Sequence, residues 1–146
     1  MEFNETQKFN QPLLWVILLG LSTLFLVKLV NNTSELNWIS FLVIIAVCLL
    51  FITMHLKTNI SKRGVKYSFF PFISKTIAWE DIENVEVINY GFIGGWGIRF
   101  TIKYGIVYNV KGNKGLFIRL KSGKKIVIGT QKSEEIKRAA NFYQSS

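Results

Sequence analysis

The sequence has few of the residues on which most enzyme active sites depend. Its 146 residues include one cysteine, one histidine and two prolines. The part after residue 56 contains neither histidine nor cysteine, and Asp81 is its only aspartate. No nucleophile-elbow, Walker A or zinc-binding pattern occurs in the chain. We therefore expect a protein that is not an enzyme and has no cofactor and no metal site.

The single cysteine, Cys48, excludes an intrachain disulfide and lies inside an apolar stretch, where a thiol acts as a small apolar side chain. His55, at the end of the same stretch, has no metal-binding partner at suitable spacing. Proline is rare and no segment is low in complexity, so we expect disorder at most in the first ten residues and the last few.

Charge is missing from two long stretches near the N-terminus, residues 13–27 and 38–54. With their flanks they extend over 13–30 and 38–56, each giving about 27 Å of helix, close to the ~30 Å core of a bilayer. A seven-residue loop separates them, which predicts an antiparallel transmembrane hairpin after a leader at 1–12. That leader lacks the positive charge of a secretory signal.

Basic residues predict the orientation of the hairpin. The loop at 31–37 contains no lysine or arginine, whereas four basic residues closely follow the second stretch, namely Lys57, Lys62, Arg63 and Lys66. By the positive-inside rule we expect residues 57–146 and the N-terminus in the cytoplasm, and the protein in the inner membrane.

The predicted cytoplasmic domain, 57–146, is strongly basic. It contains 16 of the 18 basic residues and six of the nine acidic ones, so its net charge is 16 − 6 = +10. Anionic lipid headgroups suit this charge better than nucleic acid does, because the domain begins directly after an apolar stretch.

Alternating apolar and polar residues predict strands in this domain. Ile98, Phe100, Ile102 and Tyr104 form one apolar face, which we expect on a core. Residues 116–128 predict a hairpin that turns at Ser122-Gly123. Further strands are expected at 65–70, 75–79, 84–90 and 106–110, which predicts an antiparallel barrel or sandwich of about seven strands. A C-terminal helix should cap it with its apolar face, Ile136, Ala139, Ala140 and Tyr143.

This order resembles the pleckstrin-homology (PH) fold, and in particular the bacterial PH-like domains that follow a two-helix membrane hairpin. The resemblance lies in residues 64–72, 77–82, 94–99, 108–109, 112 and 128–131. It implies an α+β membrane protein, with a helical hairpin followed by a PH-like domain. It does not imply inositide recognition, because this fold often serves protein–protein contact.

The glycine-rich segment 90–97 is the first candidate site. Phe92, Ile93 and Trp96 are candidates to enter the membrane interface or to grip a partner. Alternatively, Trp96 folds back to plug the barrel. Arg99 beside it is a candidate for an anionic group, or it pairs with a carboxylate such as Glu80 or Glu86.

The basic group Lys57, Lys62, Arg63 and Lys66 is the second candidate, because it suits anionic headgroups. Alternatively, these charges only orient the second helix. We therefore expect a membrane-anchored domain that binds an anionic membrane surface or a membrane-associated protein. The alternatives are an accessory or scaffold subunit that associates through its helices and, as a third class, a small-molecule or peptide receptor.

Overall fold

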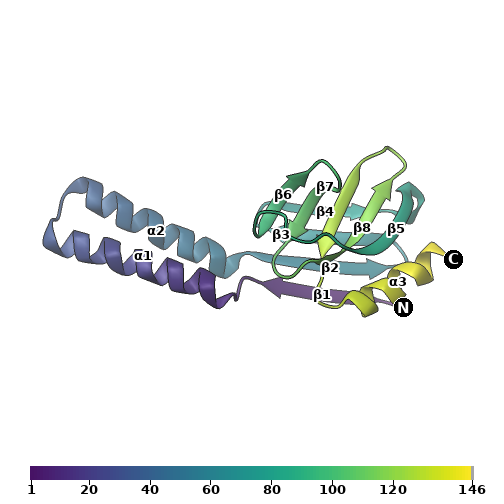
Figure 1. Ribbon diagram of the computed structural model, residues 1–146, viewed down its shortest axis with the longest axis horizontal. Coiled ribbons are helices and arrows are strands. Elements are labelled where there is room, and N and C mark those ends of the chain that lie inside the picture. The colour runs from purple at the N-terminus through teal and green to yellow at the C-terminus, as the bar shows by residue number, and fades with distance from the viewer. Residues whose placement is uncertain (146) are drawn as a thin grey trace. The chain divides into compact units, whose positions relative to one another are not determined.

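The computed structural model describes residues 1–145 and consists of two compact units. One unit contains residues 9–54, and the other combines Met1–Lys8 with the chain from His55 onward (Figure 1). The β-rich unit is therefore assembled from segments on both sides of the helical unit in the sequence.

The helical unit consists of α1 (Pro12–Asn31) and α2 (Glu35–Thr53), both long and apolar enough to cross a membrane. The predicted second span, 38–56, is displaced by three residues at each end. Ser34 begins α2 early because its hydroxyl accepts a hydrogen bond from the Asn37 amide at 3.4 Å, a typical N-cap. The C-terminal boundary differs because the chain already enters a strand at His55.

The first sheet contains β1 (Phe3–Lys8), β2 (His55–Ser61), β3 (Gly64–Phe70) and β4 (Ile73–Ile77), antiparallel and in that order. The N-terminal segment, for which the sequence predicts no strand, forms β1 and pairs with β2 over its whole length. Its inward positions are Phe3, Glu5 and Gln7. Two of these three are polar, so the sequence shows no alternation of apolar residues there.

The second sheet has the order β5-β8-β9-β7-β6, and its β7 and β9 are parallel. After the 3₁₀ turn η1 (Trp79–Asp81), the chain forms β5 (Ile82–Asn89), β6 (Gly97–Thr101), β7 (Gly105–Asn109), β8 (Lys114–Leu120) and β9 (Lys125–Gly129). The predicted hairpin around Ser122-Gly123 is confirmed: the Gly123 amide donates to the Leu120 carbonyl at 2.8 Å.

The two sheets form a sandwich and do not close into a barrel. Tyr67 and Phe69 of β3 pack against Tyr108 of β7 across the core, and the Tyr67 and Tyr108 ring centroids are 5.0 Å apart. Residues 1–145 form nine strands rather than about seven, because the sequence predicts no strand at the positions of β1 and β2.

The predicted C-terminal helix is α3 (Ser133–Gln144). Ile136, Ala139 and Ala140 are buried, as their spacing predicts, and α3 packs against strands of both sheets. Tyr143 stacks on Trp79 with ring centroids 5.7 Å apart, so both ends of α3 are attached to the sandwich.

One predicted core face is largely uncovered. Ile98, Phe100 and Ile102 are 44%, 80% and 97% exposed. Phe100 lies in one cross-strand row with Ile106, Ile126 and Ile118, and the exposure in this row falls from 80% through 38% and 9% to 0%. The first sheet therefore covers the middle of the second sheet and leaves β6 open.

Candidate functional site

The side of the first sheet that faces away from the second sheet is polar and basic. We call it the polar face. Leu56, Thr58 and Ile60 of β2 are buried, so the alternating residues Lys57 and Asn59 point outward. A hollow of about 390 Å³ lies on this face and is lined only by side chains that carry hydrogen-bond donors, namely Asn4, Lys57, Asn59, Lys66, Ser68 and Ser74.

Strand register places these side chains together. Lys57 lies opposite Ser68, and Asn59 lies opposite Lys66, in neighbouring rows of the β2–β3 pair. The Asn59 amide nitrogen donates to the Asn4 side-chain oxygen at 2.6 Å, which fixes both amides on the face. Two ammonium groups therefore border one hollow that is lined by no carboxylate.

A second hollow of about 490 Å³ adjoins the first and is also lined by Asn59 and Lys66. The β2–β3 turn contributes Lys62 and Arg63 to it, and Glu2 is its only acidic residue. The structure thus gathers all four predicted basic residues on the polar face, although the sequence shows only that they are close along the chain.

No ion pair within residues 1–145 involves the basic residues of this face. Across residues 1–145, the only ion pair made by a lysine or arginine joins Lys132 to Glu135 at 3.5 Å, in the first turn of α3. Lys57, Lys62, Arg63 and Lys66 are therefore available to an external anion.

Two exposed aromatic residues lie at one end of the first sheet and were not among the predicted site residues. Phe70 and Phe72 are 46% and 58% exposed. Phe70 lies opposite His55 in the β2–β3 pair, and the two rings stack with centroids 5.2 Å apart. Since His55 follows α2 by two residues, these aromatics belong to the end of the sheet through which the chain passes to the helices. The phenylalanine-rich run 69–72 is the sequence signal for them.

The glycine-rich segment 90–97 lies against the outer side of the second sheet. The Tyr90 amide donates to the Asn113 carbonyl at 2.9 Å, and its hydroxyl donates to the Gly112 carbonyl at 3.3 Å. Ile93 packs on a cluster formed by Tyr90, Val107, Phe117 and Val127. Ile93 therefore helps to hold the segment in place.

The other two apolar candidates of this segment point elsewhere. Phe92 is 91% exposed, and Trp96 keeps 36% of its surface exposed. This exposure does not fit the alternative of a Trp96 side chain that plugs a barrel. Phe92 and Trp96 thus keep exposed surface for contact, whereas Ile93 is partly buried against the cluster.

Tyr90 lies over Gly115 of β8 and Gly129 of β9, and its ring leaves little room for a side chain at either position. A Cβ at Gly115 would lie 3.0 Å from Tyr90 Cε1, and one at Gly129 would lie 3.3 Å from the Tyr90 hydroxyl. The ring is 5% exposed, and this burial raises the pKa of Tyr90 to about 12.

Arg99 lies apart from the other basic candidates. It is opposite Val107, whose side chain belongs to the cluster on the outer side of the second sheet. Within residues 1–145 it makes no ion pair, so it pairs with neither Glu80 nor Glu86. The predicted site residues therefore occupy opposite sides of the sandwich, with the four basic residues on the polar face and Arg99 and segment 90–97 on the other.

No protein-family model matches the sequence, and no curated protein is similar to it at a significant level. The geometry therefore carries the functional argument. It consists of a pair of long apolar helices and a β-rich unit with a basic, hollowed face. Among residues 1–145 no three histidine, cysteine, aspartate or glutamate side chains are grouped so as to hold a metal ion.

Proposed function

We propose that this protein is a membrane-anchored, non-enzymatic binding domain whose polar face engages anionic phospholipid headgroups. The observation that carries the proposal is the hollow lined by Lys57, Lys66 and uncharged donors, with no carboxylate among them. Phosphate oxygens accept hydrogen bonds from ammonium, amide and hydroxyl groups, and charge-assisted bonds to lysine are the stronger ones.

Chain continuity supports a lipid ligand over a soluble anion. Lys57 follows α2 by four residues, so a short stretch of chain joins this face to the apolar helices. Phe70, beside His55 at the same end of the sheet, and Phe72 in the following turn keep exposed rings, and aromatic rings suit the membrane interface. Basic residues near an anionic leaflet contribute about 1 kcal/mol each.

The proposed setting is the inner membrane of a bacterium, with both the N-terminus and the β-sandwich in the cytoplasm. The distribution of basic residues supports this orientation, since the α1–α2 loop has none. A relationship to bacterial PH-like domains is part of the proposal and rests on the sequence resemblance and on the order of the helices, sheets and C-terminal helix.

The test uses a sandwich freed from its helices. Lys8 and His55 lie opposite each other in antiparallel strands, so an Asn-Gly turn can replace residues 9–54. Circular dichroism and cooperative unfolding first establish that this variant folds. If it does not, the full-length chain in nanodiscs of neutral or anionic lipid replaces it, and a lysine-directed crosslinker to the headgroups reports contact.

Flotation with neutral and with anionic vesicles, at low and moderate salt, then measures binding. Lys57→Gln with Lys66→Gln should weaken binding to anionic vesicles about 30-fold, since two contacts of about 1 kcal/mol each are lost. The matched control, Lys121→Gln with Lys124→Gln, makes the same change of charge at the β8–β9 turn. An equal loss in both pairs would mean unspecific attraction, and no binding to anionic vesicles would end the proposal.

The second candidate function is an accessory subunit that associates through its helices. It is favoured by the packing of α1 and α2 through small side chains, where Ser22 Oγ lies 3.6 Å from Cys48 Sγ. Association through such helices should survive high salt, whereas headgroup binding should weaken. Crosslinking of the full-length chain in membranes at both salt concentrations separates the two functions.

A further inference from the structure

Strand β6 presents an open edge and an uncovered apolar face. Among the strands of residues 1–145 it is the last of its sheet, and it pairs with β7 alone. Phe100 is 80% exposed, and its cross-strand neighbour Ile106 is 38% exposed. Both lie on the side of the sheet that forms the core further in, so the apolar surface of the core continues outward onto β6.

The other edge strands carry features that discourage further pairing. β1 and β5 both pack against α3, and β5 also has an irregularity between Ile82 and Asn84. β4 carries an exposed lysine, Lys75, opposite Tyr67 and therefore on the core side of its sheet. β6, in contrast, reads Gly-Ile-Arg-Phe-Thr, without lysine, proline or bulge, and its one charged residue, Arg99, lies on the face opposite to Phe100. Edge strands of monomeric proteins are usually guarded by such features, and an unguarded edge is a template for another strand.

We propose that β6 pairs antiparallel with β6 of a second copy of this chain, about a twofold axis at Phe100. Opposite residues of an antiparallel pair lie on the same face of the sheet. In this register Phe100 lies opposite the partner's Phe100, and Ile98 faces the partner's Ile102, the first residue of the turn that follows β6. The exposed apolar side chains of the two copies then cover one another.

Charge selects this register over the neighbouring one. A twofold axis at Arg99 would place two guanidinium groups directly opposite each other, which destabilises a strand pair. The axis at Phe100 instead places Arg99 opposite the partner's Thr101. Both outer faces then carry a charged residue beside a hydroxyl group.

A second copy of β6 meets every requirement for pairing with β6. The pairing needs another extended segment with an open edge, apolar residues on one face and no opposed charges, and β6 supplies all three to itself. Two helices long and apolar enough to cross a membrane would also confine the copies to one plane, which raises their effective concentration. The proposal does not depend on the headgroup site, which lies on the other sheet.

Disulfide trapping tests the register in the full-length chain. Cys48→Ala removes the only cysteine. In that background, Phe100→Cys should form disulfide-linked dimers on mild oxidation in liposomes at low protein density, because opposed residues lie within disulfide reach. Phe92→Cys is the matched control, since Phe92 is an exposed phenylalanine outside β6. Its yield of dimer should be several-fold lower.

Mixtures of two cysteine variants test the register of the β6 pair. Ile98→Cys alone should crosslink weakly, whereas a mixture with Ile102→Cys should give the heterodimer at a several-fold higher yield. Equal yields from Phe100→Cys and Phe92→Cys would overturn the proposal. So would a mixture that crosslinks no better than Ile98→Cys alone.

The mass of the particle in detergent provides an independent measurement. Light scattering should give twice the mass of the chain for the wild type and the single mass for Phe100→Lys. Phe92→Lys should keep the doubled mass, and circular dichroism should show that both variants are folded. A wild-type chain of single mass, or a Phe100→Lys variant of doubled mass, would refute the pairing. Phe100→Lys could instead weaken binding of the helix-free sandwich to vesicles and leave the mass of the full-length particle unchanged. The β6 face would then contact lipid, and the proposal would also be wrong.

Discussion

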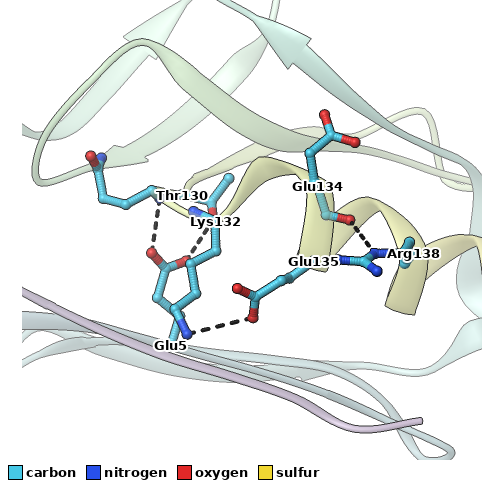
Figure 2. A network of polar contacts seen from close by, with 7 residues as sticks. Glu5, Thr130, Lys132, Glu134, Glu135 and Arg138 are labelled. Carbon is cyan, nitrogen blue, oxygen red and sulfur yellow. Dashed lines mark hydrogen bonds and ion pairs between the residues drawn. The ribbon is translucent and has the colours of Figure 1, made fainter.

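The Thr130 hydroxyl donates a hydrogen bond of 2.6 Å to a carboxylate oxygen of Glu5, a residue 125 positions earlier in the chain (Figure 2). The other Glu5 oxygen accepts from the Gln131 amide at 2.8 Å. Gln7, the next inward-facing residue of β1, donates to the Gly129 carbonyl at 2.7 Å. Strand β1, which precedes the helices in sequence, is thus attached to the junction of β9 and α3.

Removal of the Glu5 carboxylate should destabilise the sandwich. Glu5 is 7% exposed, and Glu5→Ala leaves the Thr130 hydroxyl and the Gln131 amide without their acceptor. We expect a loss of about 2–4 kcal/mol, since unsatisfied buried groups cost about 1–3 kcal/mol each. Urea unfolding of the full-length chain in detergent, followed by tryptophan fluorescence, measures it.

Glu2→Ala is the matched control, because Glu2 is exposed on the same N-terminal segment. It should change the free energy of unfolding by less than about 0.5 kcal/mol. A double-mutant cycle with Thr130→Val should show coupling. Equal effects of Glu5→Ala and Glu2→Ala would contradict the attachment of β1.

Gly115→Ala should disturb the packing of segment 90–97. Its Cβ would lie 2.7 Å from Val127 Cγ1 and 3.0 Å from Tyr90 Cε1. Overpacking of this kind costs about 1–3 kcal/mol. The combination with Tyr90→Leu should recover part of that loss, because Leu has no ring over Gly115. Thermal unfolding by circular dichroism is the measurement.

The control is Gly91→Ala, where a Cβ meets nothing within 4 Å but the backbone has φ of +67°. It should cost about 1–2 kcal/mol from backbone strain alone. Tyr90→Leu should not restore this variant. If Tyr90→Leu restores the stability of both glycine variants, or of neither, the contact with Tyr90 is not the reason that position 115 needs a glycine.

Alkaline pH should destabilise the sandwich through its buried tyrosines. Burial raises the pKa of Tyr90 to about 12, and the pKa of Tyr67 is raised further by burial and by the neighbouring Tyr108. The unfolded chain ionises tyrosine near pH 10, so it releases the Tyr90 proton first. The Tyr90 contribution to stability is therefore complete below about pH 10 and is lost as the pH rises to about 12.

Urea unfolding at a series of pH values between about 8 and 12 measures this dependence. Tyr90→Phe should flatten the decline, because phenylalanine has no proton to release. If the wild type and Tyr90→Phe lose stability in parallel, the Tyr90 hydroxyl does not cause the effect.

Cysteine labelling tests the proposed orientation. In the Cys48→Ala background, Thr33→Cys places a thiol in the exposed α1–α2 loop, and Ser122→Cys places one in the exposed β8–β9 turn. A membrane-impermeant maleimide added to intact bacterial cells should label Thr33→Cys. It should label Ser122→Cys only after the cells are permeabilised. The reverse pattern would place the sandwich outside.

Several features follow from local sequence. The two apolar helices depend on composition over about 20 residues, and the hairpin at Ser122-Gly123 and the apolar face of α3 depend on turn residues and spacing. All of these are present in the structure. The offset of α2 and the presence of β1 were not predicted. β1 was missed because strands were predicted from alternating apolar residues, and two of its inward residues, Glu5 and Gln7, are polar.

The candidate site depended on tertiary structure much more than the helices did. Spacing along the chain suggested that Lys57, Lys62, Arg63 and Lys66 act together, and the β2–β3 register brings them around adjoining hollows. The sequence could not reveal that Arg99 lies on the opposite side, because that depends on how two sheets pack.

The sequence by itself determined which residues of β6 share a face, because side chains alternate along any strand. Whether that face is buried was decided by the tertiary structure. The covering layer comes from β1 to β4, which are distant in sequence, and their sheet does not extend over Phe100. Burial is a property of the opposing layer, so the same apolar alternation gives a core at Ile118 and an exposed surface at Phe100.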